Sequence, residues 1–207
     1  GSELDATMHY PFRTAVLDFL LGKIHAQAAC DAFWTIQEHY PKENLHAALN
    51  LIGSHDRARV LTVLGGDVNA LKMAMFLQFA LPGVPSIYYG DEQGMCGVGD
   101  PFNRLPFREG EMELHDLYAQ LANMRGANPA LSTGDAVFMA YNADILLVLR
   151  YVRGGVDHFG ASAENGAFLA VINRGAAQCF DVECPEEYDF GRLSGVADEF
   201  SAKIIKV

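Results

Sequence analysis

A short polar run follows one of the most apolar stretches of the chain and has the residue types of a catalytic or ligand-binding loop. Residues 48–52 are predicted to form a buried strand, and Gly53 ends it. His55 and Asp56 come next, followed by two arginines. A histidine can donate hydrogen bonds or carry a proton, and a carboxylate can hold hydroxyl groups or stabilise developing positive charge. The run is therefore the first candidate for a functional site.

A structural interpretation of the same residues is also open. Asp56 would cap the following helix, and His55 would be a hydrogen-bonded histidine close to the core. The position of the run favours function, because ligands of parallel sheets bind at the carboxyl ends of the strands, where the loops vary and the strands fix them.

The elements around this run alternate. Up to about Asn128 short apolar strands alternate with helical patterns. We expect an extended segment over 6–10 and strands over 48–52 and 84–89. Helices are expected over 15–21, 25–40 and 111–125, and Asp67 is expected to cap a further helix. Such alternation indicates parallel strands buried on both faces. After Pro129 strands follow strands, over 136–141, 145–152, 167–172, 180–182 and 203–207. We predict an α/β plus all-β chain with two domains, residues 1–130 and an antiparallel β-sandwich over 131–207.

Composition limits the partners. The chain has 207 residues, half of them hydrophobic, and 15 basic against 26 acidic residues give a net charge of −11. This charge disfavours nucleic acids and anionic membrane surfaces as partners. The longest apolar stretch, over residues 73–81, is too short to cross a bilayer.

The histidines lack metal-ligand spacing, so we predict no metal and no cofactor. A bridge between Cys179 and Cys184 is not expected, since they would point to opposite faces of a strand. Tyr88, Tyr89 and Trp34 are predicted to pack in the interior.

Residues 50–59 resemble the fourth sequence motif of the alpha-amylase family of glycoside hydrolases, in the form found in its neopullulanase and cyclomaltodextrinase branch, with Arg59 three residues after Asp56. Further segments resemble parts of that family in the same order. Residues 4–12 match the sixth barrel strand, where asparagine is more usual than His9. The others are 61–67 after the fourth motif, 83–95 at the eighth strand and its turn, which contains Glu92, 100–104 in the next loop, and 200–207 in the last strand of the C-terminal sandwich.

The resemblance implies a fold and a set of roles. Residues 1–130 would be the C-terminal part of a TIM (β/α)8 barrel, its last three β/α units with strands six to eight, and the antiparallel β-sandwich would follow. Asp56 would stabilise the transition state, and His55 would contact substrate hydroxyls. Arg59, Asp100 and Arg104 would bind substrate, although Asp100 and Arg104 could equally be an ordinary surface ion pair.

The nucleophile and acid/base motifs of the family have no match in the sequence. Retaining glycoside hydrolysis needs two carboxyl groups about 5–5.5 Å apart, which a third carboxylate cannot replace. We therefore expect this chain to be part of a retaining hydrolase of maltooligosaccharides, cyclodextrins or pullulan, and to be inactive alone. The alternative is a non-catalytic glucan-binding or interaction module. An oligosaccharide is the expected substrate of the whole enzyme, cytoplasmic localisation is expected, and a half-barrel face with open strand edges predicts self-association.

Overall fold

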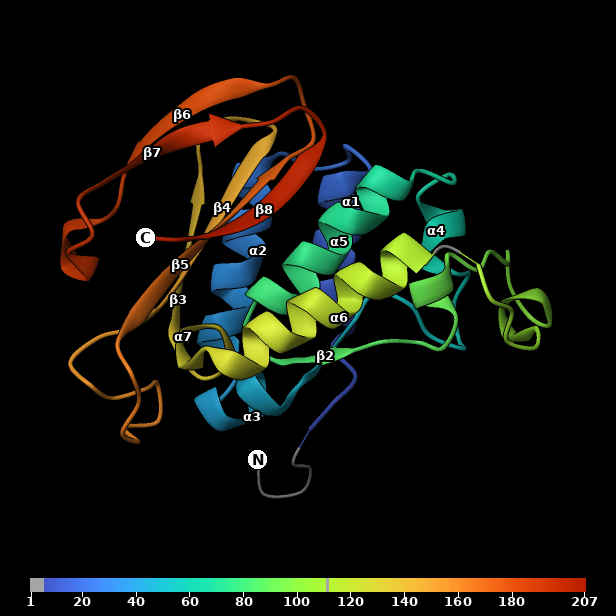
Figure 1. Ribbon diagram of the computed structural model, residues 1–207, viewed down its shortest axis with the longest axis horizontal. Coiled ribbons are helices and arrows are strands. Elements are labelled where there is room, and N and C mark those ends of the chain that lie inside the picture. The colour runs from blue at the N-terminus through green and yellow to red at the C-terminus, as the bar shows by residue number, and fades with distance from the viewer. Residues whose placement is uncertain (1–5, 111) are drawn as a thin grey trace.

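The computed structural model describes residues 6–110 and 112–207. Leu4 and Asp5 of the predicted sixth-strand motif, and Glu111 at the start of a predicted helix, lie outside the described residues. A helix-rich part comes first and a strand-rich part follows (Figure 1). The helices are α1 (Tyr10–Leu20), α2 (Ala26–His39), α3 (Lys42–Ala47), α4 (Val60–Val63), α5 (Val68–Ala80), α6 (Met112–Ala127) and α7 (Pro129–Ser132), with 3-10 turns η1 (Asp91–Gln93), η2 (Phe102–Arg104) and η3 (Glu186–Tyr188).

The first part contains a small parallel sheet. Strand β1 (Leu49–Leu51) pairs in parallel with β2 (Val84–Ser86), and Met8 forms one parallel bridge to Leu49. The predicted strand over 6–10 is reduced to that bridge, because α1 already begins at Tyr10, where His9 Nδ1 accepts a hydrogen bond from the Phe12 amide. All three segments run in the same direction, so their carboxyl ends meet on one side of the molecule.

The second part is built from antiparallel strands. These are β3 (Asp135–Ala140), β4 (Ile145–Val152), β5 (Gly166–Asn173), β6 (Gln178–Glu183), β7 (Arg192–Ala197) and β8 (Ser201–Lys206). They form one sheet in the order β3-β4-β5-β8 and a separate hairpin of β6 with β7. Strand β7 was not predicted, because its sequence, RLSGVA, has a polar residue and a glycine where an apolar strand pattern would continue.

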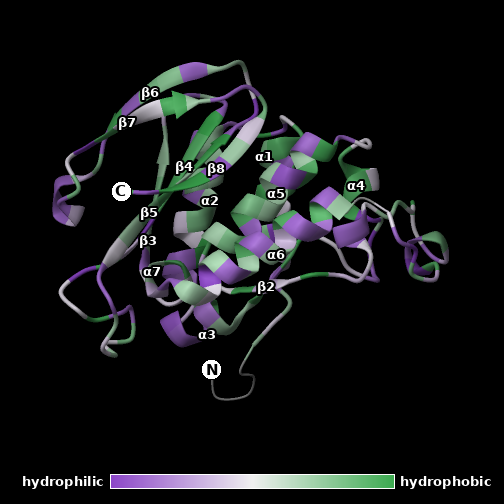
Figure 2. Cartoon of the chain, viewed as in Figure 1, coloured by the Kyte–Doolittle hydropathy of each residue, from purple (hydrophilic) through white to green (hydrophobic). Residues whose placement is uncertain are grey.

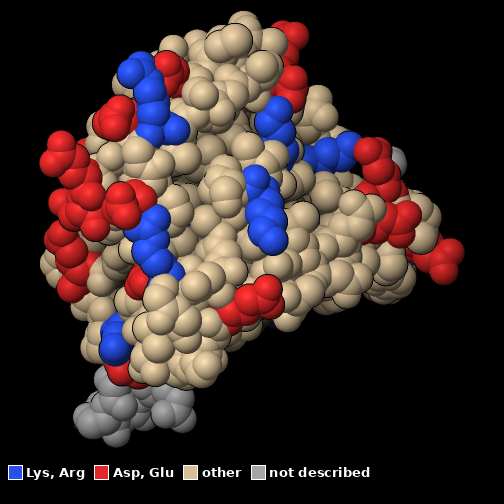
Figure 3. All heavy atoms as spheres, turned by 60° about the vertical axis from the view of Figure 1, so that its left-hand side comes forward, with Lys and Arg blue, Asp and Glu red and all other residues tan. Residues whose placement is uncertain are grey.

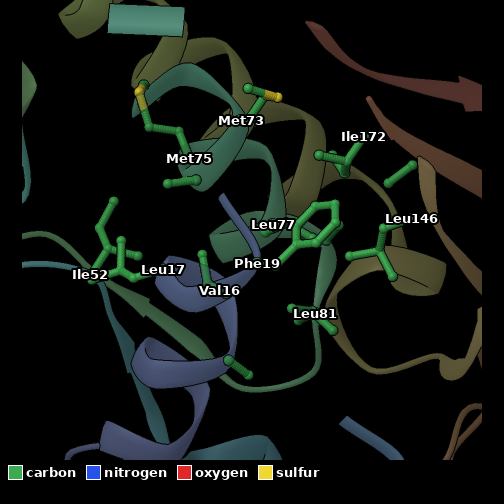
Figure 4. Packing of buried hydrophobic residues seen from close by; sticks show 14 of the residues in the cluster. Val16, Leu17, Phe19, Ile52, Met73, Met75, Leu77, Leu81, Leu146 and Ile172 are labelled. Carbon is green, nitrogen blue, oxygen red and sulfur yellow. The ribbon is translucent and has the colours of Figure 1, made fainter. Parts of the chain in front are cut away.

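The four-stranded sheet is buried on both faces, and its central strands are hydrophobic along their length (Figure 2). On one face, Phe19 of α1 lies among Leu77 and Leu81 from α5 and its end, and Leu146 and Ile172 from the sheet (Figure 4). The other face packs against the hairpin in a second cluster that includes Leu147, Leu169, Phe180 and Leu193. The largest core therefore crosses the predicted boundary at residue 130, and the two predicted units stabilise each other.

Arg150 and Arg174 join the same two parts. Arg150 of β4 donates to the carbonyl of Ala80 at 2.6 Å. Within the first part, Arg125 of α6 donates to the carbonyl of Phe79 at 2.6 Å. Arg174 donates to the carbonyls of Phe19 and Ile24. Carbonyls in the last turn of a helix have no partner within that helix, and a cation there is favoured by the helix dipole. These contacts fix the ends of α1 and α5 against the sheet.

Several local predictions are confirmed. Asp67 caps α5, since its carboxylate accepts from the amides of Asn69 at 2.8 Å and Ala70 at 3.1 Å. Trp34 packs against Phe138, with 4.9 Å between ring centroids. The same prediction is wrong for Tyr89, whose side chain is 40% exposed. The four cysteines, all within the described residues, are free thiols.

The surface carries scattered charges. On the face drawn in Figure 3, acidic side chains lie mainly at the left edge and at the right end, and basic ones are dispersed without forming a continuous patch. Among the described residues, no helix is long and apolar enough to span a membrane.

Candidate functional site

The candidate site is the turn that follows β1. Gly53 and Ser54 are buried, and His55, Asp56 and Arg57 are exposed. The turn lies at the carboxyl end of β1, next to the segment that follows its parallel neighbour β2. Its position agrees with the sequence prediction, and it leaves the side chains of the turn accessible to a ligand.

The Asp56 carboxylate is held from two sides while remaining open to solvent. Its Oδ1 lies 3.0 Å from His55 Nε2, and its Oδ2 accepts a hydrogen bond from the Tyr10 hydroxyl at 3.3 Å. The two side chains are 59% (His55) and 56% (Asp56) exposed. The structural interpretation of these residues is therefore wrong: His55 is far from buried, and the N-cap of the next helix, α4, is Arg59.

Ser54 and Tyr10 complete this arrangement. The Ser54 hydroxyl accepts from the amide of Asp56 at 3.3 Å and lies 3.2 Å from the hydroxyl of Tyr10. Sequence reasoning assigned no role to Tyr10, which stands 46 positions from Asp56 in the chain. The parallel bridge of Met8 to β1 is what brings the start of α1 beside the turn.

Arg59 was predicted to bind substrate, but its side chain is not exposed to a ligand. It is fully buried, and its guanidinium donates to the carbonyl of Tyr89 and lies 3.2 Å from the Asp91 carboxylate. The rings of Tyr88 and Tyr89 flank it at 4.3 and 4.6 Å. In this position Arg59 ties the segment after β1 to the segment after β2, so a positioning role fits its surroundings better than a direct contact with substrate.

Asp91 shares this buried position and explains the glycine at 53. A Cβ on Gly53 would overlap the Asp91 carboxylate, so only glycine lets the two segments approach this closely. Asp91 and Glu92 both lie in η1, as the prediction of a structural turn for Glu92 requires. Burial raises the pKa of Asp91 to about 7, against the opposing effect of Arg59.

This shift predicts a pH-dependent stability. The pKa of Asp91 is higher in the folded chain than the ordinary value of 3.8, so the folded state binds the extra proton between these pH values. The resulting stabilisation is complete below about pH 3.8 and is lost as the pH rises to about 7. We expect the unfolding free energy of the wild type, measured in urea, to fall relative to that of Asp91→Asn as the pH rises over this range. A difference that stays constant with pH would contradict the assignment.

Asp100 and Arg104 form an exposed ion pair with 3.6 Å between Arg104 Nε and Asp100 Oδ1. Arg104 Nε also donates to the His55 carbonyl at 3.2 Å, which places it beside the turn. Between them, buried Asn103 donates to the same turn, a contact that no sequence pattern indicated. Among the described residues, no group of three or more His, Cys, Asp or Glu side chains is arranged to hold a metal ion.

Comparison with known proteins places this chain in a family. The model of the alpha-amylase catalytic domain matches residues 1–130. The chain belongs to the alpha-amylase family. An amylopullulanase of Thermoanaerobacter thermohydrosulfuricus is 35% identical in an alignment 211 residues long, which covers 88% of this chain and 14% of that protein. A cyclomaltodextrinase of Geobacillus thermopakistaniensis is 38% identical in an alignment 151 residues long, which covers 70% of this chain and 26% of that protein.

Solved structures agree with this alpha-amylase assignment. The cyclic α-maltosyl-(1→6)-maltose hydrolase of Arthrobacter globiformis superposes with a TM-score of 0.85 and 29% identity, over 100% of this chain and 45% of that one. The predicted family is thereby confirmed, and the homologues are α-glucan hydrolases by name. The chain spans less than half the length of each of these three relatives.

Proposed function

We propose that this chain supplies the transition-state-stabilising carboxylate of a retaining α-glucan hydrolase. One observation carries the proposal: the exposed Asp56 carboxylate is held between His55 and Tyr10 at the carboxyl end of a parallel strand, in a member of the alpha-amylase family. Ligand sites of barrel enzymes lie at that end of the strands.

The proposed chemistry follows from charge. As the glycosidic bond breaks, the sugar ring gains oxocarbenium character. A carboxylate fixed beside the ring hydroxyls makes contacts that strengthen as positive charge develops, so it lowers the barrier more than it improves ground-state binding. His55 Nε2, which already faces Asp56, is placed to share the same hydroxyls. The nucleophile and the general acid would come from barrel segments outside residues 1–207.

The architecture supports a finer proposal. Met8, β1 and β2 would be barrel strands six, seven and eight, and β3–β8 would be the C-terminal β-sandwich. Asp100 and Arg104 would contact more distant glucose units from the exposed loop that closes against His55. Arg59 would hold the ends of strands seven and eight together from within.

The test of this proposal is an assay of the purified chain on maltoheptaose, cyclodextrin and pullulan. We expect no release of reducing sugar, because two of the three carboxylates of the mechanism have no counterpart in the sequence. Turnover that disappears in Asp56→Ala would overturn the expectation.

We also propose that the chain self-associates. The outer edge of β2 is free of a strand partner within the described residues, and Met8, Val84 and Ile87 near the parallel sheet are each more than 40% exposed. Open strand edges and exposed apolar side chains both favour association. Light scattering on the dilute protein should give a mass above that of one 22.6 kDa chain. A folded monomer would contradict this proposal.

A further inference from the structure

The buried side-chain amide of Asn103 donates hydrogen bonds to the candidate turn on both sides of Asp56. Asn103, in η2, is 1% exposed, and its Nδ2 lies 2.8 Å from the carbonyl oxygen of His55 and 2.9 Å from that of Arg57. Both partners are acceptors, so both hydrogens of the amide are used and the orientation of the amide is fixed. The two gripped carbonyls belong to the residues immediately before and after Asp56.

Asn103 is itself firmly anchored. Its backbone N–H donates to the carbonyl of Gly99 at 3.0 Å, and its backbone carbonyl accepts from the Tyr88 hydroxyl at 3.3 Å. A Cβ on Gly97 would overlap the backbone at Phe102, so a glycine at 97 is what lets this loop fold tightly upon itself. The two hydrogen bonds from Asn103 therefore connect the turn to the segment that follows β2.

The other hydrogen bonds to the turn are longer, including those of the Tyr10 hydroxyl to Ser54 at 3.2 Å and to Asp56 at 3.3 Å. Within it, the Arg57 amide lies 3.4 Å from the Ser54 carbonyl, and the Asp56 amide lies 3.3 Å from the Ser54 hydroxyl. Both are at the long end of the hydrogen-bond range. Arg104 adds one contact to the His55 carbonyl, from a side chain that is half exposed. Asn103 provides the two shortest hydrogen bonds to the turn, and among the described residues it is the only buried side chain outside the turn that donates to it.

We propose that Asn103 is a positioning residue for Asp56 and His55. The effect of this positioning on catalysis rests on the proposed function. A carboxylate can stabilise a transition state only if its backbone holds it in place. Misplacement by about 1 Å can lower the rate about 100-fold. Asn103 supplies that restraint without touching substrate.

A single substitution can remove both donors of the Asn103 side chain while keeping its shape. Asn103→Asp keeps the shape of the side chain but has no N–H group, and it sets a carboxylate against two carbonyl oxygens. Asn69→Asp, at an exposed position in α5, makes the same chemical change away from the turn and is the matched control.

The experiment is backbone ¹⁵N relaxation on the whole chain. We expect order parameters near ~0.85 for residues 55–57 in the wild type and Asn69→Asp, and values below ~0.6 for these residues alone in Asn103→Asp. Unchanged order parameters at 55–57 would overturn the proposal. Should Asn103→Asp fail to fold, Asn103→Ala removes both donors without adding charge and decides the question by the same measurement.

This readout is independent of glucan chemistry. If maltoheptaose leaves the signals of residues 55–57 unmoved in the wild type, the proposed function fails, and the relaxation data still decide whether Asn103 holds the turn. If glucan does bind there, a chimaera that joins this chain to the preceding barrel segments of a relative should lose at least about tenfold of kcat in Asn103→Asp with little change in KM. A loss confined to melting temperature would overturn a positioning role.

Discussion

Asp56→Asn is expected to lower kcat by at least about 1,000-fold in a completed barrel, because it removes the charge that strengthens as the oxocarbenium-like transition state forms. A suitable barrel is a chimaera in which residues 1–207 replace the matching segment of the Arthrobacter globiformis hydrolase, because all of this chain aligns with 45% of that one. The measurement is the rate of sugar release at saturating substrate. KM should change far less than kcat, since the contact acts mainly in the transition state.

Asp31→Asn provides the control for this loss of charge. Asp31 is an exposed residue of α2 whose carboxylate accepts from Gln27 within the same helix, so its substitution should leave kcat unchanged. A chimaera that is active and remains equally active with asparagine at position 56 would show that the carboxylate has no part in the reaction.

Arg150→Met is expected to destabilise the chain by about 1–3 kcal/mol for each buried carbonyl that loses its donor. The Arg150 side chain is fully buried and donates to the carbonyls of Ala80, Gly134 and Asp135 at 2.6, 2.9 and 3.2 Å. Methionine fills similar space but leaves those carbonyls without a donor, and unpaired buried polar groups are costly. Urea unfolding at a fixed protein concentration measures the loss.

Arg153→Met is the corresponding surface substitution. Its guanidinium is about half exposed and pairs with Asp189 at the surface, and such pairs contribute about 0–1 kcal/mol. Equal losses in the two variants would mean that Arg150 does not join α5 to the sheet in the way its contacts indicate.

The position of the candidate turn could be predicted from the sequence because its signals are local. A buried strand ended by glycine fixes where the turn begins, and parallel strands fix which end of the sheet it occupies. The cap at Asp67 and the long apolar strands of the sheet follow from equally local rules.

What the sequence could not show depends on contacts between distant segments. The burial of Arg59 requires Asp91, Tyr88 and Tyr89 to come from beyond α5, and an arginine next to a polar run reads as exposed from its neighbours alone. The grip of Asn103 on His55 spans 48 positions. The shared core beneath β4 and β5 was also missed, since an apolar strand does not reveal which helix will cover it.

The central claim is that glucan binds against the turn carrying His55 and Asp56, and an NMR titration of the chain with maltoheptaose tests it most directly. The account predicts that the backbone signals that move belong to residues 53–57 and to the neighbouring η2, and that Asp56→Ala weakens the response. Movement confined to another surface, such as the hairpin of β6 with β7, or no movement at saturating glucan, would contradict it.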